Sequence, residues 1–134
     1  MIVVDASVLA PALADDGPDG DLARERLGPE RLAAPWLVDL EVTSVLRRAA
    51  ASGRLPDRRA RQALADLAAL PLERAPHTPL LPRIWELREN VTAYDAAYVA
   101  LAEAIDASLL TADGRLARAS GVLCPVELVR SPIR

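Results

Sequence analysis

Lysine and phenylalanine are absent from this chain of 134 residues, and cysteine occurs once. The lack of lysine excludes any activity that needs a catalytic or phosphate-neutralising lysine. The single thiol, at Cys124, cannot form a disulfide within the chain, which is typical of a reducing compartment. The N-terminus lacks a basic region followed by a long apolar stretch, and no apolar run approaches the length of a membrane span. We therefore expect a cytoplasmic protein without a secretion signal and without contact with a membrane.

Aromatic residues make up only 3% of the chain, although 51% of it is hydrophobic. The core must therefore be built from leucine, valine, isoleucine and alanine. The length is that of one domain with a sizeable core, and we expect residues 1–134 to form a single domain. The formal net charge of −3 disfavours a non-specific nucleic-acid binder, which is usually basic. It does not exclude a nuclease whose own acids are covered by metal ions.

Short apolar segments alternate with helical patterns along the chain. Strands are expected at 2–4, within 31–35, over 71–76, and at 108–111, 122–123 and 126–129. Helices are expected at 7–14, 21–27, 36–52, 56–70, 80–90, 94–106 and 114–119. Such alternation is typical of an α/β domain with a mostly parallel central sheet.

Two acidic residues follow predicted strands. Asp5 ends the segment "MIVVD", and Asp113 ends "SLLTAD". In a parallel sheet, ligands bind outside the carboxyl ends of the strands, so both positions suit a functional site. Aspartate is also a preferred residue at a helix N-cap. Each acid taken alone therefore fits a cap about as well as a functional role.

Two further acids lie near the starts of predicted helices. Asp95 follows Thr92 by three residues, which resembles a capping box. Its helix is apolar nearly all round, however, which directs Asp95 toward packed structure. Glu41 borders the apolar stripe of helix 36–52, although an ion pair within the helix or simple exposure would explain it too. The neighbouring Asp39 lies nearer the polar side and is the second choice.

The combination of four acids is more informative than any one of them. If they meet at one end of the sheet, they cannot all stay ionised without a counter-charge, and no lysine is available. Oxygen ligands favour hard divalent cations, Mg²⁺ or Mn²⁺. A soft-metal site is not expected, because His77 and Cys124 are each the only residue of their kind. We expect His77 in a solvated loop and Cys124 as a small core residue.

Four motifs carry a family resemblance. In their order along the chain, "VVDAS", "LEVTSVLRR", "YDAAYVALA" and "LLTADGRLA" resemble the motifs of PIN-domain ribonucleases. The size and the order further resemble the toxin half of VapBC-type toxin–antitoxin pairs, over essentially the whole chain. The resemblance implies a three-layer α/β/α PIN-like fold with a mostly parallel sheet. It also implies Mg²⁺- or Mn²⁺-dependent endonucleolytic cleavage of RNA by metal-activated water, an antitoxin partner and a homodimer.

The same resemblance implies roles for individual residues. The catalytic acids and metal ligands that it implies are Asp5, Glu41, Asp95 and Asp113. Ser7 and Thr111 match small hydroxyl positions in the first and last motifs, and we expect them to hydrogen-bond the carboxylates or metal-bound waters. Many relatives carry an acid where Arg115 stands. One metal position is therefore either weak here or filled only when RNA phosphate adds its oxygens, and Arg115 either contacts that phosphate or is solvated.

Basic and aromatic side chains offer further candidate contacts to RNA. The arginines that could contact phosphates are Arg47, Arg48, Arg58, Arg59 and Arg61. For most of these arginines we expect a solvated helix face rather than a contact to RNA. We expect Trp36 to pack in the core, with stacking on a base as the alternative.

Other classes of protein fit the sequence less well. A phospho-accepting receiver domain normally needs a lysine late in the chain, and an aspartate-based phosphatase would carry a second aspartate where Ser7 stands. A Gly-rich phosphate loop is also absent. The alternatives that stay open are a non-catalytic RNA- or protein-binding PIN-like module and a housekeeping nuclease without an antitoxin. A metal-dependent cleavage assay and a search for a small upstream antitoxin-like reading frame would separate these alternatives.

Overall fold

Five short parallel strands form the sheet of the computed structural model, which describes residues 1–130. The strands are β1 (Ile2–Val4), β2 (Leu32–Pro35), β3 (Leu72–Ala75), β4 (Leu109–Thr111) and β5 (Val126–Leu128). They lie in the order β3-β2-β1-β4-β5, which places β1 at the centre. Val3 is in register with Ala33 of β2 on one side and with Leu109 of β4 on the other. The three apolar residues of β1 are buried, which suits a strand covered on both faces.

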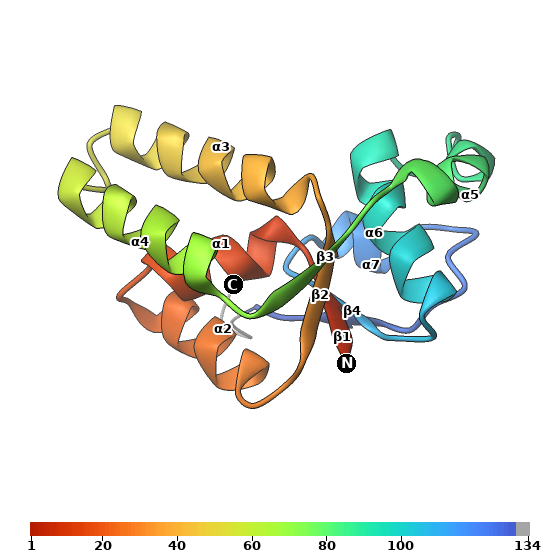
Figure 1. The fold of residues 1–134 in the computed structure, drawn as a ribbon, viewed down its shortest axis with the longest axis horizontal. Coiled ribbons are helices and arrows are strands. Elements are labelled where there is room, and N and C mark those ends of the chain that lie inside the picture. The colour runs from red at the N-terminus through yellow and green to blue at the C-terminus, as the bar shows by residue number, and fades with distance from the viewer. Residues whose placement is uncertain (131–134) are drawn as a thin grey trace.

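Helices cover both faces of this sheet (Figure 1). α1, α2, α3 and α4 pack together on one side, and α5 and α6 lie on the other. The bounds are α1 (Ala6–Ala14), α2 (Pro18–Leu27), α3 (Val38–Ala51), α4 (Asp57–Ala69), a 3₁₀ turn (Thr78–Leu80), α5 (Leu81–Glu86), α6 (Ala93–Ala104) and α7 (Gly114–Ala117). The three-layer α/β/α architecture predicted from the sequence is confirmed.

The core is aliphatic, as the scarcity of aromatic residues predicted. Valine, leucine and alanine side chains dominate it, and among residues 1–130 Tyr98 is its one aromatic member. Tyr98 lies on α6, whose residues 96–102 are all buried between the strands β1, β2 and β4 and the neighbouring α5 and 3₁₀ turn. Trp36 is 55% exposed, so the expectation that it packs in the core is wrong. His77 is exposed in a loop, as predicted, and Cys124 is half-buried at the edge of the core.

The structure departs from the predicted elements in three places. Residues 122–123 form no strand, because the backbone N–H of Leu123 donates to the carboxylate of Glu103 (2.8 Å) and not to a neighbouring strand. The helix expected over 80–90 ends at Glu86 and continues as turns. α2 begins earlier than predicted, at Pro18, because proline is favoured in the first turn of a helix.

Within residues 1–130, no helix is both long enough and apolar enough to span a bilayer. The expected single domain included residues 131–134, which lie outside the described part of the chain.

Candidate active site

The carboxyl ends of β1 and β4 place two acids at one edge of the sheet. Asp5 directly follows β1 and caps α1, because its Oδ1 accepts a hydrogen bond from the backbone N–H of Ser7 (3.0 Å). Asp113 follows β4 and caps α7, accepting from the N–H of Arg115 (2.9 Å). Both acids therefore do serve as helix caps. Their caps also orient the two carboxylates, so a capping role and a functional role are compatible.

Two helices bring the other acids to the same place. Glu41 lies in the first turn of α3, and Asp95 lies in the first turn of α6. All four predicted acids line one pocket of about 230 Å³, hereafter the acid pocket. The remaining residues that line it are Ala6, Ser7, Ser44, Val45, Arg48 and Tyr98. Four segments that are distant in sequence thus converge on one cluster of carboxylates.

Ser7 is the centre of a hydroxyl network beneath Asp5. Its Oγ donates to Oδ1 of Asp5, accepts from the backbone N–H of Ala112 (2.8 Å) and lies 3.4 Å from Oγ1 of Thr111. Thr111 in turn accepts from the backbone N–H of Asp113 (3.0 Å). The predicted contact of Ser7 with a carboxylate is present, and the network links the ends of β1 and β4.

Tyr98 belongs to the site but was not predicted as a site residue. Its hydroxyl donates a hydrogen bond of 2.5 Å to Oε1 of Glu41, although the two residues are 57 positions apart. The one available signal in the sequence was the position of Tyr98 three residues after Asp95, which puts the two residues on the same face of a helix. Its aromatic ring suggested only core packing, and the partner of its hydroxyl could not be found without the fold.

Burial shifts the proton affinity of the acids. Desolvation raises the pKa of Asp5 from 3.8 to about 6, although hydrogen bonds from Ser7 and Thr111 oppose the shift. Burial also raises the pKa of Glu41, and the hydrogen bond from Tyr98 partly opposes this. The pKa of Asp95 is raised by burial and then by the nearby charge of Asp113. The pocket thus holds carboxylates whose negative charge is poorly solvated and mutually repulsive.

The arginines predicted to contact phosphate differ in how close they lie to the acid pocket. Arg48 lines the acid pocket, with its Nη1 donating to Oγ of Ser44 (3.0 Å). Arg115 is 91% exposed, and its Nε lies 3.8 Å from Oδ1 of Asp113. Arg47 is exposed but does not line the pocket.

The cluster predicted at residues 58–61 lies elsewhere. Arg59 forms an ion pair with Asp16, and Arg61 pairs with Asp57 on its own helix. Arg58 lines a different cavity, described below. Local acids therefore already neutralise two of these three arginines.

Asp39, the second choice for the α3 acid, faces away from the site. It pairs with Nε of Arg74 on β3 at 2.8 Å and does not line the acid pocket. This ion pair explains Asp39 structurally and leaves Glu41 as the acid that α3 supplies.

The donors of the acid pocket suit a hard divalent cation. Its charged ligand candidates are carboxylate oxygens, whereas His77 and Cys124 lie outside it. Among residues 1–130, no three carboxylate, imidazole or thiol side chains are grouped closely enough to form a finished metal cage. Mg²⁺ does not require one, because it keeps several waters and commonly takes one or two carboxylates together with substrate phosphates. The residues therefore fit a hydrated cation that is completed by substrate.

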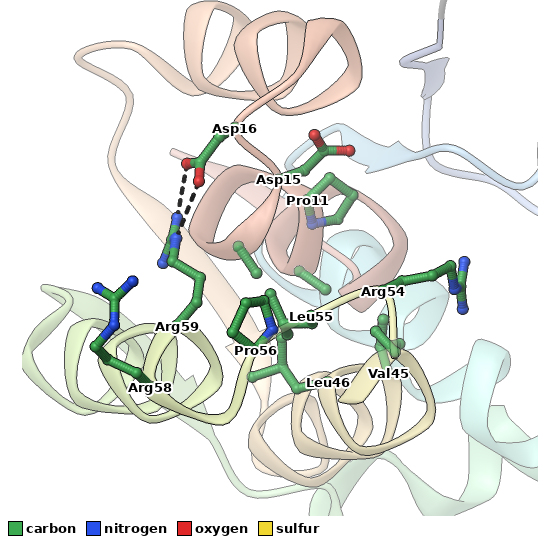
Figure 2. Close-up of a pocket in the computed structure, with 13 residues that line it drawn as sticks. Pro11, Asp15, Asp16, Val45, Leu46, Arg54, Leu55, Pro56, Arg58 and Arg59 are labelled. Carbon is green, nitrogen blue, oxygen red and sulfur yellow. Dashed lines mark hydrogen bonds and ion pairs between the residues drawn. The ribbon is translucent and has the colours of Figure 1, made fainter. Parts of the chain in front are cut away.

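A larger cavity of about 650 Å³ lies beside the acid pocket, between α1, α3 and α4. Figure 2 shows its apolar lining, including Leu46 and Leu55, and the ion pair of Asp16 with Arg59 at its rim. Val45 lines both this cavity and the acid pocket, so the two hollows are neighbours.

Comparison with known proteins places this geometry in a family. The family model for the PIN domain matches residues 2–122. Ribonuclease VapC9 of Mycobacterium tuberculosis is 47% identical over 129 residues, covering 96% of this chain and 98% of that protein. Ribonuclease VapC1 of the same species is also 47% identical, with 96% and 97% covered.

Solved structures share the fold at lower identity. The crystal structure of M. tuberculosis VapC20, a toxin described as cleaving the sarcin–ricin loop, superposes with a TM-score of 0.69 at 20% identity. The alignment covers 92% of this chain and 97% of VapC20. A chain of VapBC2 from Rickettsia felis, solved with a promoter DNA fragment, has a TM-score of 0.69 at 17% identity and covers 97% of this chain and 100% of that chain. The chain belongs to the PIN-domain family and, within it, to the VapC ribonucleases.

Proposed function

We propose that the protein is a metal-dependent endoribonuclease and the toxin component of a type II toxin–antitoxin system. The observation that carries the proposal is the convergence of Asp5, Glu41, Asp95 and Asp113 on one pocket. A similarity to proteins named VapC ribonucleases over nearly the whole chain supports RNA as the substrate.

In this proposal the acid pocket, lined by the four carboxylates, holds a hydrated Mg²⁺ or Mn²⁺ whose ligands are completed by substrate phosphate. When bound, the cation supplies Lewis acidity toward the scissile phosphate and the attacking water. Ser7 keeps the carboxylate of Asp5 in place by donating to its Oδ1. Arg48, at the wall of the pocket, supplies positive charge to an RNA phosphate.

A cleavage assay tests this function. Purified protein should cut RNA in Mg²⁺ or Mn²⁺, stop in excess EDTA, and recover when metal is restored. Cleavage that continues undiminished in EDTA, in a preparation free of contaminating nuclease, would overturn the proposed metal mechanism. A folded protein that cuts no RNA under any metal condition would favour a non-catalytic binding module.

We further propose a cognate antitoxin that occupies the hollows beside the active site. The larger cavity has apolar side chains such as Leu46 and Leu55, and it adjoins the acid pocket at Val45. An antitoxin segment with apolar side chains could lie there and extend an arginine into the acid pocket. Such an arginine would be partly desolvated and would meet the carboxylates in a specific geometry.

Growth assays test the antitoxin proposal. We expect expression of this chain alone to slow growth and coexpression with the upstream neighbouring gene to restore it. The Asp113→Asn variant should be harmless alone, because it lacks one of the catalytic acids. Normal growth at high levels of folded, unpartnered wild-type protein would contradict the toxin assignment.

We also propose that two copies of this chain form a homodimer. Leu40 on α3 is 75% exposed, and Trp36 just before this helix is 55% exposed. Contact between two copies of the chain would remove these apolar side chains from water.

A further inference from the structure

Tyr98 connects the two helices that carry Glu41 and Asp95. It lies three residues after Asp95 on α6, and its hydroxyl reaches Oε1 of Glu41 on α3 at 2.5 Å. The side chain is 0% exposed, so this hydroxyl is sequestered from bulk water. A phenylalanine ring would fill the same aliphatic surroundings. Packing alone therefore does not account for the hydroxyl, whereas its contact with a carboxylate of the acid pocket does.

Two of the neighbouring aspartates, Asp5 and Asp113, are oriented by local backbone contacts. Asp5 accepts from the N–H of Ser7, and Asp113 accepts from the N–H of Arg115, in each case two residues later. Glu41 has a longer side chain with one more rotatable bond. The side-chain hydrogen bond that the structure gives to Glu41 comes instead from a different element, α6.

We infer that Tyr98 is a positioning residue, whose buried hydroxyl holds the carboxylate of Glu41 toward the acid pocket. The inference rests on the proposed function, because the pocket is taken as the cation site. With Oε1 held by Tyr98, the orientation of Oε2 is set before a cation arrives. A ligand that is already oriented loses less freedom when it binds. Partners that orient metal ligands in this way commonly contribute about tenfold to hundredfold to metal affinity or activity.

Direct Mn²⁺ binding to the full chain tests this role without RNA. In Tyr98→Phe, the Kd for Mn²⁺, measured by electron paramagnetic resonance of free Mn²⁺, should rise about tenfold. The melting temperature in EDTA should change little, because the ring is kept. Tyr94→Phe is the matched control, since Tyr94 lies on the same helix, is exposed, and loses the same atom. An unchanged Kd in Tyr98→Phe, or an equal rise in Tyr94→Phe, would overturn the inference.

A double-mutant cycle separates positioning of Glu41 from a general effect on the fold. If Tyr98 acts through the Glu41 carboxylate, Tyr98→Phe should raise the Kd for Mn²⁺ little further when Glu41→Gln is already present. A full tenfold increase in that background would show that Tyr98 acts by another route, and the inference would fail.

Proton NMR of the metal-free protein tests the contact between the Tyr98 hydroxyl and Glu41 independently of any metal. The chain has only two tyrosines, so their hydroxyl signals can be assigned. The Tyr98 hydroxyl proton should be visible, slow to exchange and close to the Glu41 side chain, and its signal should shift in Glu41→Gln. A rapidly exchanging hydroxyl proton would contradict the positioning of Glu41. Failure of wild-type protein to bind Mn²⁺, with the NMR contact present, would instead overturn the proposed function.

Discussion

Asp5 shows at the scale of one residue how a carboxylate can serve the fold and the chemistry together. It ends a buried strand, caps α1 and faces the acid pocket. Burial raises its pKa to about 6, so its charged form is disfavoured in the metal-free protein. A bound cation would supply the missing counter-charge. Functional sites often sacrifice stability in this way.

The raised pKa of Asp5 predicts a pH-dependent stability. Between about pH 4 and pH 7 the folded state binds this proton more tightly than the unfolded chain, so the free energy of unfolding falls as pH rises. In EDTA at about pH 7.5, Asp5→Asn should therefore be more stable than wild type by about 1 kcal/mol, with hydrogen-bond changes offsetting part of the shift. At about pH 4 the two proteins should be nearly equal. Urea unfolding at both pH values measures this, and a gain that is the same at both would contradict it.

The residues of the site differ in how far the sequence could reveal them. Asp5 and Asp113 were found because each ends an apolar segment, and Glu41 was preferred to Asp39 because it borders an apolar stripe. Tyr98 was missed as a site residue because its partner is 57 positions away. Periodicity shows which side of a helix is buried, but it does not show which distant side chain that side meets.

At the scale of elements, apolar strands and helices were predictable and tertiary pairings were not. β1, β4 and α6 lie where their apolar patterns placed them, within one or two residues. The strand expected at 122–123 does not form, because Glu103 binds the N–H of Leu123. That carboxylate sits on α6, and its reach to this segment depends on the completed fold.

Glu103 on α6 is hydrogen-bonded to Arg83 on α5 and to the segment at 121–123. It accepts bonds from Nε and Nη2 of Arg83 at 2.7 and 3.1 Å, and Nη2 also donates to the carbonyl of Gly121 (2.7 Å). The hydrogen bond from Arg83 lowers the pKa of Glu103. Because the pKa of Glu103 is lower in the folded protein than in the unfolded chain, its ionised form stabilises the fold at pH values above the unfolded pKa. This stability is lost as the pH falls through the pKa of the folded state.

We expect Glu103→Gln to destabilise the protein by about 1–2 kcal/mol near neutral pH, since Glu103 is only 15% exposed. The difference from wild type should shrink in acid, below about pH 4. Glu86→Gln is the matched control, because Glu86 meets the same arginine but is 65% exposed, and should cost less than about 0.5 kcal/mol. Urea unfolding measures both variants. Equal losses in the two would contradict a special role for Glu103.

At the scale of the whole molecule, the described surface combines an acid pocket, an adjoining apolar cavity and two exposed apolar side chains at the start of α3, Trp36 just before it and Leu40 within it. In the proposed complex, the shared boundary at Val45 would let one antitoxin segment fill the cavity and reach the acids. RNA would then be excluded from the same acids. The proposed inhibition would then be direct occupation of the site, with no conformational change required.

The proposed dimer makes a prediction about mass. Light scattering of the purified chain should give about twice the monomer mass of 14.3 kDa. Leu40→Ser should shift the population toward monomer, because it removes an exposed apolar side chain that the dimer would cover. A monomeric wild type at high protein concentration would contradict the dimer.

The central claim is that four carboxylates act together as the catalytic site. Single-turnover cleavage of a labelled RNA in Mn²⁺ tests it most directly, using Asp5→Asn, Glu41→Gln, Asp95→Asn and Asp113→Asn beside wild type. Each variant should lose rate by orders of magnitude. Asp39→Asn should keep the wild-type rate, since Asp39 pairs with Arg74 outside the pocket. If any one of these four variants folds and still cleaves RNA at the wild-type rate, the account is contradicted.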